Sequence, residues 1–366
     1  MTTHNPSDIA AKIQVLEDLV HADPPENLSE MTWLRSQDAA TDITTITEAL
    51  NRGAVPGLYM TRIGMVHLSP GATREKIRPV TAPLMGALLA EHVYMTRRLA
   101  RKGGVTTARV HPTRSIIAQT LAGTDWPGIP PLRRLVAFPT LCADGTVLLA
   151  PGYDPASGTY RDPRPGADYS HLAADPTPSQ IREARRFIGQ ELLPDFPWSS
   201  QADRANCLAL LCTPALRDYI GTVPAAQTPF GIVSSRDGGA NRRLLADLIC
   251  GPFQGSSCLV GTSIQIDLSN AVCGEPGFGR AAAARSVPVR LGPESPRPDL
   301  REWIGRAENQ AGVVASVLIL ARSWIMAGAP RIRTRMYDCS AWASAMAGLL
   351  DHHGVSGFLG NMEWPD

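Results

Sequence analysis

Residues 229–250 read PFGIVSSRDGGANRRLLADLIC, and this stretch indicates the fold more directly than any other part of the chain. It begins with a short apolar run at 229–234, passes through consecutive glycines, and returns to helical spacing at 241–249. A strand, a glycine-bearing turn and a helix in that order form the frame of a phosphate-binding P-loop. The stretch therefore predicts an α/β core built around this strand and this helix.

Apolar periodicity on both sides of this stretch predicts the rest of the core. Two further apolar runs favour strands, at 259–268 and 287–291. Amphipathic spacing and end signals predict four helices, at 179–193 with a cap at Thr177 or Ser179, at 200–219 with a break at Pro214, at 306–327 before Gly328, and at 340–352 before Gly354.

The N-terminal half mixes helical and strand patterns. Helices are predicted in the leader, from the stripe of Ile9, Ile13, Leu16 and Leu19, and at 83–99 and 115–121. The run at 57–68 around Gly64 predicts a hairpin or a bulged strand, and a hairpin is predicted at 135–160 around Asp144-Gly145, with a second turn at 154–158. Pro, Gly and Asp concentrate at 161–178, which is typical of a linker. We expect a helical leader at 1–50, an α+β domain at 51–175, the α/β core at 176–291 and a helical C-terminal subdomain at 292–366.

Composition favours a globular cytoplasmic protein. Of the 366 residues, 44% are hydrophobic and 19% charged, which is enough apolar material for a sizeable core. The first residues lack the basic-then-apolar order of a signal peptide, and no run reaches the roughly 18 apolar residues of a spanning helix, so no membrane partner is expected. The seven cysteines show no CxxC or zinc spacing and are expected to be reduced core residues.

Seven segments between residues 136 and 361 follow one another in a distinctive order: PTLCADGTVLLAPGYDPASG, LPDFPWSSQADRANCLALL, RRLLADLI, AARSVPVRL, SPRPDLREW, LILARSWIMAGAP and WASAMAGLLDHHGVSGFLGN. This ordered series resembles the helicase region of phage, prophage and plasmid primase-helicases. The resemblance implies a shortened AAA+-like P-loop core of the superfamily 3 kind, ATP and Mg²⁺ as cofactors, DNA at replication forks as a partner, and assembly into a homo-oligomeric ring.

The resemblance also assigns residues to the phosphate-binding loop, whose pattern is G-x-x-x-x-G-K-[ST]. Gly238 and Gly239 fall in the loop, and the positions of the last Gly, the Lys and the Ser/Thr are taken by Asn241, Arg242 and Arg243. An Arg fork differs from a Lys ammonium in shape and reach, and Arg243 cannot bind a cation. Lysine occurs only at Lys12, Lys76 and Lys102, so no shifted alignment restores one. We therefore expect little or no ATP hydrolysis.

Two further positions are candidates for ATPase chemistry. Only residues 251–258 separate the loop's helix from the next predicted strand, which is fewer than a parallel crossover needs, so a strand–helix pair is predicted to be missing. Asp267 is then the candidate metal ligand, or simply a polar strand end. Arg285 resembles the arginine finger that completes a neighbouring subunit's site, or it is a surface residue.

Two basic clusters are candidate nucleic-acid contacts. The net charge is only +1, so any such contact has to be local. One cluster follows the helix predicted at 83–99, and the other forms an alternating strip after Pro330; they comprise Arg97, Arg98, Arg101 and Lys102, and Arg331, Arg333 and Arg335. Each cluster either contacts phosphates or is solvated, the first as a helix cap.

Three functional hypotheses remain open: a pseudo-ATPase that binds DNA or other subunits, an active helicase subunit using Arg242 in place of the lysine, and an inert prophage relic.

Overall fold

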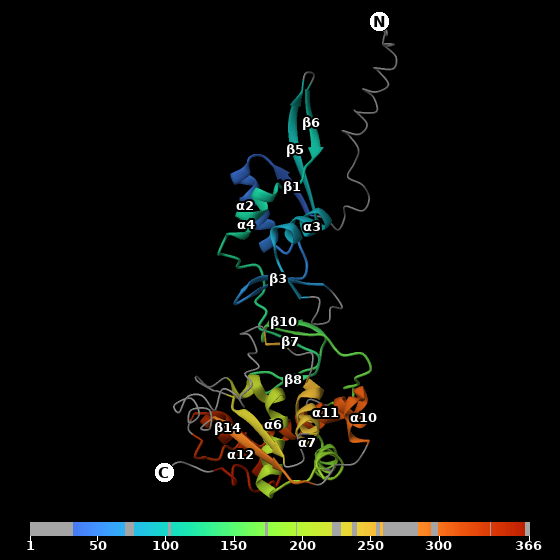
Figure 1. Ribbon diagram of the computed structural model, residues 1–366. Helices are drawn as coiled ribbons and strands as arrows, with labels where there is room; N and C mark the ends of the chain where they lie inside the picture. The colour runs from blue at the N-terminus through green and yellow to red at the C-terminus, as the bar shows by residue number, and fades with distance from the viewer. Residues whose placement is uncertain are drawn as a thin grey trace. The chain divides into compact units, whose positions relative to one another are not determined.

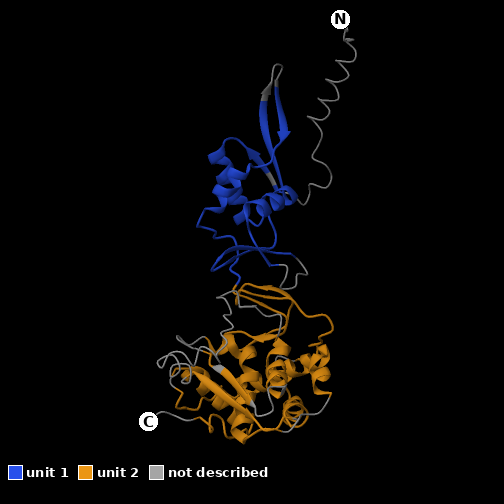
Figure 2. Cartoon of the chain, viewed as in Figure 1, with its two compact units in different colours: residues 1–132 blue, residues 133–366 orange. Residues whose placement is uncertain are grey.

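The computed structural model describes residues 32–69, 77–101, 104–172, 175–194, 196–221, 228–235, 240–253, 257–258, 285–293, 299–336 and 338–362. It mixes α-helices with small sheets of two to four strands. The chain divides into two compact units at Leu132–Arg133 (Figure 2). The segment 161–178, where the sequence predicts a linker, lies inside the second unit.

Unit 1 contains a three-stranded sheet flanked by helices (Figure 1). Strand β1 (Thr32–Ser36) runs parallel to β5 (Val93–Arg101), which pairs antiparallel with β6 (Gly104–Arg109). Each helix begins at a side chain that accepts a hydrogen bond from a backbone N–H of its first turn, as N-caps do. The helices and their caps are α2 (Ala39–Asn51, Asp38), α3 (Ala82–His92, Thr81) and α4 (Arg114–Leu121, Thr113).

A second small sheet in unit 1 confirms the hairpin predicted at 57–68. Strands β2 (Leu58–Thr61) and β3 (Gly64–Leu68) pair antiparallel, and β4 (Ile77–Pro79) pairs with β3. Gly64 has a φ of +125°, a conformation that favours glycine, at the turn between β2 and β3.

The helix predicted at 83–99 is wrong in its second half. Helix α3 ends at His92, and Val93–Arg101 continues as strand β5. Val93 and Met95 are buried while Arg98 is exposed, and the backbone of Val93–Arg97 pairs with Thr32–Ser36. Arg97, Arg98 and Arg101 therefore lie on a strand and are not helix-capping residues; Lys102 lies outside the described residues.

Unit 2 begins with short strands that confirm the predicted hairpins. Strands β8 (Thr140–Leu141) and β9 (Val147–Leu148) flank Gly145, whose φ is +83°. A four-stranded sheet has the order β10 (Gly152–Asp154), β11 (Thr159–Arg161), β7 (Arg134–Val136) and β13 (Ser257–Cys258).

The strand and helix predicted from residues 229–250 are both confirmed. Strand β12 (Phe230–Ser235) pairs in parallel with β14 (Ser286–Leu291), the predicted strand at 287–291, and helix α7 (Ala240–Cys250) packs against β12. A one-turn 3-10 helix, η4 (Gly251–Phe253), follows α7. The strand predicted at 259–268 and the leader helix lie outside the described residues.

The predicted helices of unit 2 are confirmed, with one difference inside α6. They are α5 (Pro178–Arg186), which continues as a π-helix η3 (Phe187–Leu192), then α6 (Gln201–Ile220), α11 (Ala307–Met326) and α12 (Ser340–His352). The short helix α10 (Leu300–Gly305), before α11, was not predicted. Pro214 does not split α6, which runs through it without interruption. Burial of α6 on most of its length outweighs the hydrogen bond that proline removes.

Buried polar side chains of helix α6 form hydrogen bonds with the backbone of β14. Asp203 accepts a hydrogen bond from Arg290 N at 2.8 Å, and Asn206 donates to the carbonyl of Pro288 at 2.8 Å. Asn206 also accepts from Leu359 N at 2.9 Å, so the loop after α12 is attached to the same site. These bonds fix the register between helix, strand and C-terminal loop.

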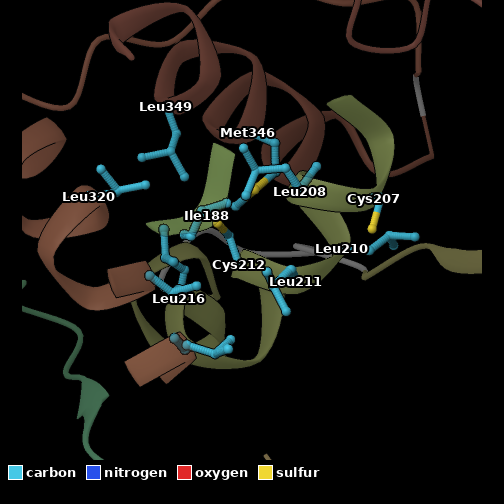
Figure 3. Close-up of a cluster of buried hydrophobic side chains, with 14 of the residues drawn as sticks. Ile188, Cys207, Leu208, Leu210, Leu211, Cys212, Leu216, Leu320, Met346 and Leu349 are labelled. Carbon is cyan, nitrogen blue, oxygen red and sulfur yellow. The ribbon is translucent and has the colours of Figure 1, made fainter. Parts of the chain in front are cut away.

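The core of unit 2 lies where α6 meets α11, α12 and η3 (Figure 3). Ile188, Leu208, Leu320 and Leu349 from these four elements belong to one buried cluster. By length and composition, α11 could cross a membrane, but 67% of its apolar window is buried inside the unit, as in a core helix of a globular domain. Cys207 and Cys212 are buried free thiols in this cluster.

Candidate functional site

The first turn of α7 presents two of the predicted phosphate-binding residues to solvent. Its sequence is Ala-Asn-Arg-Arg: Asn241 is buried, and Arg242 and Arg243 are exposed. Cations at a helix N-terminus oppose the helix dipole, whereas a bound anion would interact favourably with both the dipole and the cations. The turn thus has the charge of an anion site, and its exposed arginines offer no oxygen ligand for Mg²⁺.

The described residues do not make up an identifiable P-loop core. Among them β12 pairs only with β14, and the predicted loop residues Gly238 and Gly239 lie outside the described ranges. Asp267, the predicted metal ligand, also lies outside them. Within the described part of the chain, no group of three His, Cys, Asp or Glu side chains could hold a metal ion.

Arg285, the predicted arginine finger, lies directly before β14. Its Nε is 3.4 Å from Oδ2 of Asp338 in the same chain, and both side chains are nearly half exposed. An exposed ion pair of this kind contributes little to stability and opens readily.

Strands β5 and β6 extend past the end of β1 as a two-stranded ribbon (Figure 1). The last β5 residue that pairs with β1 is Arg97, opposite Ser36, whereas pairing with β6 continues to Arg101, opposite Gly104. We call residues 98–107 the basic ribbon. The sequence from Val93 to Arg109 contains five basic residues and no Asp or Glu: Arg97, Arg98, Arg101, Lys102 and Arg109.

The arginines at the base of the ribbon are held in place. Arg97 donates from Nε to Ser36 Oγ at 2.8 Å and from Nη2 to Asp42 Oδ2 at 3.1 Å. Arg109 donates to the carbonyl of Ala90 at 3.3 Å and lies over the ring of Tyr94 at 4.9 Å. These contacts anchor the ribbon to α2 and α3, while Arg98 further out is exposed.

The predicted strip of Arg331, Arg333 and Arg335 is exposed along α12. Its backbone is fixed, because Ile332 N donates to Ser344 O at 3.1 Å and Trp324 Nε1 donates to Pro330 O at 2.9 Å. A Cβ at Gly348 of α12 would stand only 1.8 Å from Pro330 O, so this glycine permits the close approach.

A cavity of about 690 Å³ in unit 2 was not predicted from the sequence. It lies between the hairpin turns and the C-terminal end of α6, and its charged lining residues are Arg133, Arg134, Arg217 and Asp218. Arg134 forms an ion pair with Asp218, whereas Arg133 and Arg217 form none with a described residue. In the sequence, the only local signs of this cavity are the adjacent pairs Arg133-Arg134 and Arg217-Asp218, which lie 84 residues apart.

Comparison with models of protein families, with curated proteins and with solved structures found no match for this chain. Function therefore has to be inferred from the chemistry of the described residues. Their common feature is arginine in exposed positions on both units: on the basic ribbon, at the start of α7, and on the strip along α12.

Proposed function

We propose that the chain is a nucleic-acid-binding pseudo-ATPase, related to the helicase region of phage and plasmid primase-helicases, with a degenerate AAA+-like P-loop core. In this proposal the protein binds DNA through charge and does not hydrolyse ATP. The observation that carries the proposal is the basic ribbon. A two-stranded ribbon fits the major groove of DNA, and a ribbon whose sequence holds three cations, Arg98, Arg101 and Lys102, and no carboxylate attracts phosphates of either single or double strands.

The loop chemistry supports binding without hydrolysis. β12 and α7 follow one another in the order of the strand and helix of a P-loop, and Arg242 and Arg243 in the first turn of α7 are exposed cations. Hydrolysis needs Mg²⁺ held between protein and phosphates, and Arg243 occupies the position of the hydroxyl ligand. Nucleotide binding is therefore expected to be weak and independent of Mg²⁺. Calorimetry with ATP, with and without Mg²⁺, tests this, and tight binding that requires Mg²⁺ would contradict it.

The two alternatives predict different outcomes in one assay. An active helicase subunit, with Arg242 in the lysine role and Arg285 reaching a neighbouring subunit of a ring, would hydrolyse ATP faster when DNA is present. A relic would neither bind DNA nor hydrolyse ATP. DNA-stimulated ATP hydrolysis by the purified protein separates the first alternative from our proposal, and DNA binding separates the second.

The decisive experiment measures DNA affinity against salt concentration. Each phosphate contact on single-stranded DNA contributes about −0.7 to the slope of log affinity against log salt. Replacing Arg98, Arg101 and Lys102 by Ala should therefore flatten the slope by about 2 if all three contact phosphates. The matched control replaces Arg52, Arg62 and Arg78, which are exposed in unit 1 away from the ribbon. Equal slopes for the two triple variants would refute the role of the ribbon.

A further inference from the structure

A second cavity of about 250 Å³ lies inside unit 2, within the helical core. Its walls come from η3, α6, α11 and α12, and include Ile188, Leu208, Leu320 and Leu349, which Figure 3 shows pointing toward a common centre. All of these side chains are aliphatic and buried or nearly so. The interior therefore suits an apolar group.

The mouth of this cavity is cationic. Arg185 and Arg204 line it together with Gln201 and His353, and no Asp or Glu occurs among the described residues that line the cavity. Apolar walls alone would accept any hydrocarbon. Two guanidinium groups without a neighbouring carboxylate restrict the ligand to one that carries a negative charge at one end.

The two arginines are oriented by backbone carbonyls and by a histidine. Arg204 Nη2 donates to the carbonyl of Gly189 in η3 at 2.6 Å. Arg185 donates to His353 Nδ1 at 3.1 Å and to the carbonyl of His352 at 3.1 Å. Each guanidinium carries five N–H donors, so donors remain for a ligand.

His353 is neutral and does not supply charge. Its Nδ1 accepts from Arg185, and its Nε2 lies 2.9 Å from the carbonyl of Leu320, to which it donates. Burial lowers its pKa to about 4, which agrees with this tautomer at neutral pH. The fixed positive charge at the mouth therefore belongs to the two arginines.

The π-helix contributes to the shape of the site. Residues Phe187–Leu192 form η3 in continuation of α5, and this segment places both Ile188 in the wall and the Gly189 carbonyl against Arg204. Short π-helical turns occur frequently at functional sites because they redirect side chains and carbonyls that a regular α-helix would align.

We propose that this cavity binds a small amphiphilic monocarboxylate, with its carboxylate between Arg185 and Arg204 and its apolar body among Ile188, Leu208 and Leu349. A dry cavity of about 150 Å³ holds benzene, and ligand pockets begin at about 300 Å³, so 250 Å³ fits a body of roughly six to eight carbons. This site is distinct from the surfaces of the proposed function and does not depend on them.

Calorimetry on the full chain with three probes of equal length tests the ligand class. Octanoate is expected to bind, 1-octanol to bind at least tenfold more weakly, and octylammonium to show no binding. Octylammonium binding as tightly as octanoate would overturn the proposal, and so would the failure of octanoate to bind.

Variants test the location of the site. Arg204→Gln and Arg185→Gln should each weaken octanoate at least tenfold and leave octanol unchanged. Ala205→Leu, which adds a side chain to the cavity wall, should abolish binding of both. Arg182→Gln, an exposed change on α5 outside the cavity, is the control and should bind octanoate like the original protein. Unchanged octanoate affinity in both arginine variants would overturn the assignment even if Ala205→Leu failed to fold.

Discussion

At the scale of single residues, Asp42 joins three elements of unit 1. It is almost completely buried and accepts hydrogen bonds from Ser36 Oγ at 2.8 Å, Gln37 N at 2.8 Å and Arg97 Nη2 at 3.1 Å. It thereby joins β1, α2 and β5 at the base of the basic ribbon.

Asp42→Ala should lower the free energy of unfolding of unit 1 by about 3 kcal/mol, because Ser36 Oγ, Gln37 N and the partly exposed Arg97 guanidinium then lose the buried acceptor that they share. Urea unfolding followed by circular dichroism measures the loss. Asp38→Ala is the matched control, since it removes only an exposed N-cap and should cost clearly less. Equal losses in the two variants would show that the Asp42 network does not stabilise the fold.

His353 predicts a pH dependence of stability. Burial lowers its pKa from 6.5 to about 4 in the folded protein. The unfolded chain therefore takes up the proton first as the pH falls, so stability is complete above about pH 6.5 and declines toward pH 4. We expect a loss of about 2 kcal/mol over this window, after allowing for solvent around the partly exposed ring.

Comparison of His353→Gln with the original protein isolates this contribution, because the other titrating groups are common to both. The difference in unfolding free energy between the two proteins should change by about 2 kcal/mol from pH 7 to pH 4. A constant difference across that range would mean that His353 does not titrate between these values.

At the scale of elements, those whose cause lies within a few residues could be predicted from the sequence. Those that depend on residues far away in the chain could not. The hairpins around Gly64 and Gly145 were predictable, because a positive φ at glycine is specified within the turn itself. Strand β5 was not predictable, because the helical spacing of α3 continues past His92 into the residues of β5. The partner strand β1 lies 61 residues earlier in the chain, so no local pattern indicates the pairing. Burial likewise kept α6 continuous at Pro214, which was not predictable because apolar periodicity predicts one buried face, whereas α6 is buried on most of its length.

The surroundings of Gly348 and Gly305 predict opposite effects on stability when each glycine is changed to alanine. Gly348→Ala would place a Cβ against the Pro330 carbonyl and should destabilise unit 2 by about 3 kcal/mol while pushing the arginine strip away from α12. Gly305→Ala has open space and an ordinary φ, and should stabilise by about 0.5 kcal/mol. Thermal unfolding of both variants is the measurement, and a loss for Gly348→Ala below 1 kcal/mol would contradict the observed approach.

At the scale of the whole molecule, the two units carry separate basic surfaces whose contributions to the proposed DNA binding can be measured separately. Changing Arg331, Arg333 and Arg335 to Ala should flatten the salt dependence on single-stranded DNA by about 2 in the log-log slope if all three contact phosphates. Arg182, Arg186 and Arg301, which are exposed elsewhere in unit 2, provide the control triple. An unchanged slope with an intact fold would leave the strip as a solvated surface and the ribbon as the DNA contact.

Whether a candidate site could be predicted from the sequence also depends on how far apart its residues lie in the chain. The exposed arginines of α7 and of the strip were found from the sequence, since each set is contiguous. Both cavities were missed, because they depend on side chains brought together from separate elements: Arg134 meets Asp218, and Arg185 meets His353, 168 residues away. The spacing of residues in the sequence does not show which distant side chains come into contact.

The parallel pairing of β1 with β5 has a consequence for the newly made chain. Thr32 pairs with Val93, so 61 further residues have to be synthesised before the partner of β1 exists. At about 5–20 residues per second, the ribosome needs roughly 3–12 seconds for this, whereas the β5–β6 hairpin can close within about 10 microseconds of its own emergence. During that interval the backbone edge of β1 that pairs with β5 in the finished sheet has no partner. Slow codons between β1 and β5 would lengthen this exposure and increase aggregation during translation, whereas slow codons after β6 would not.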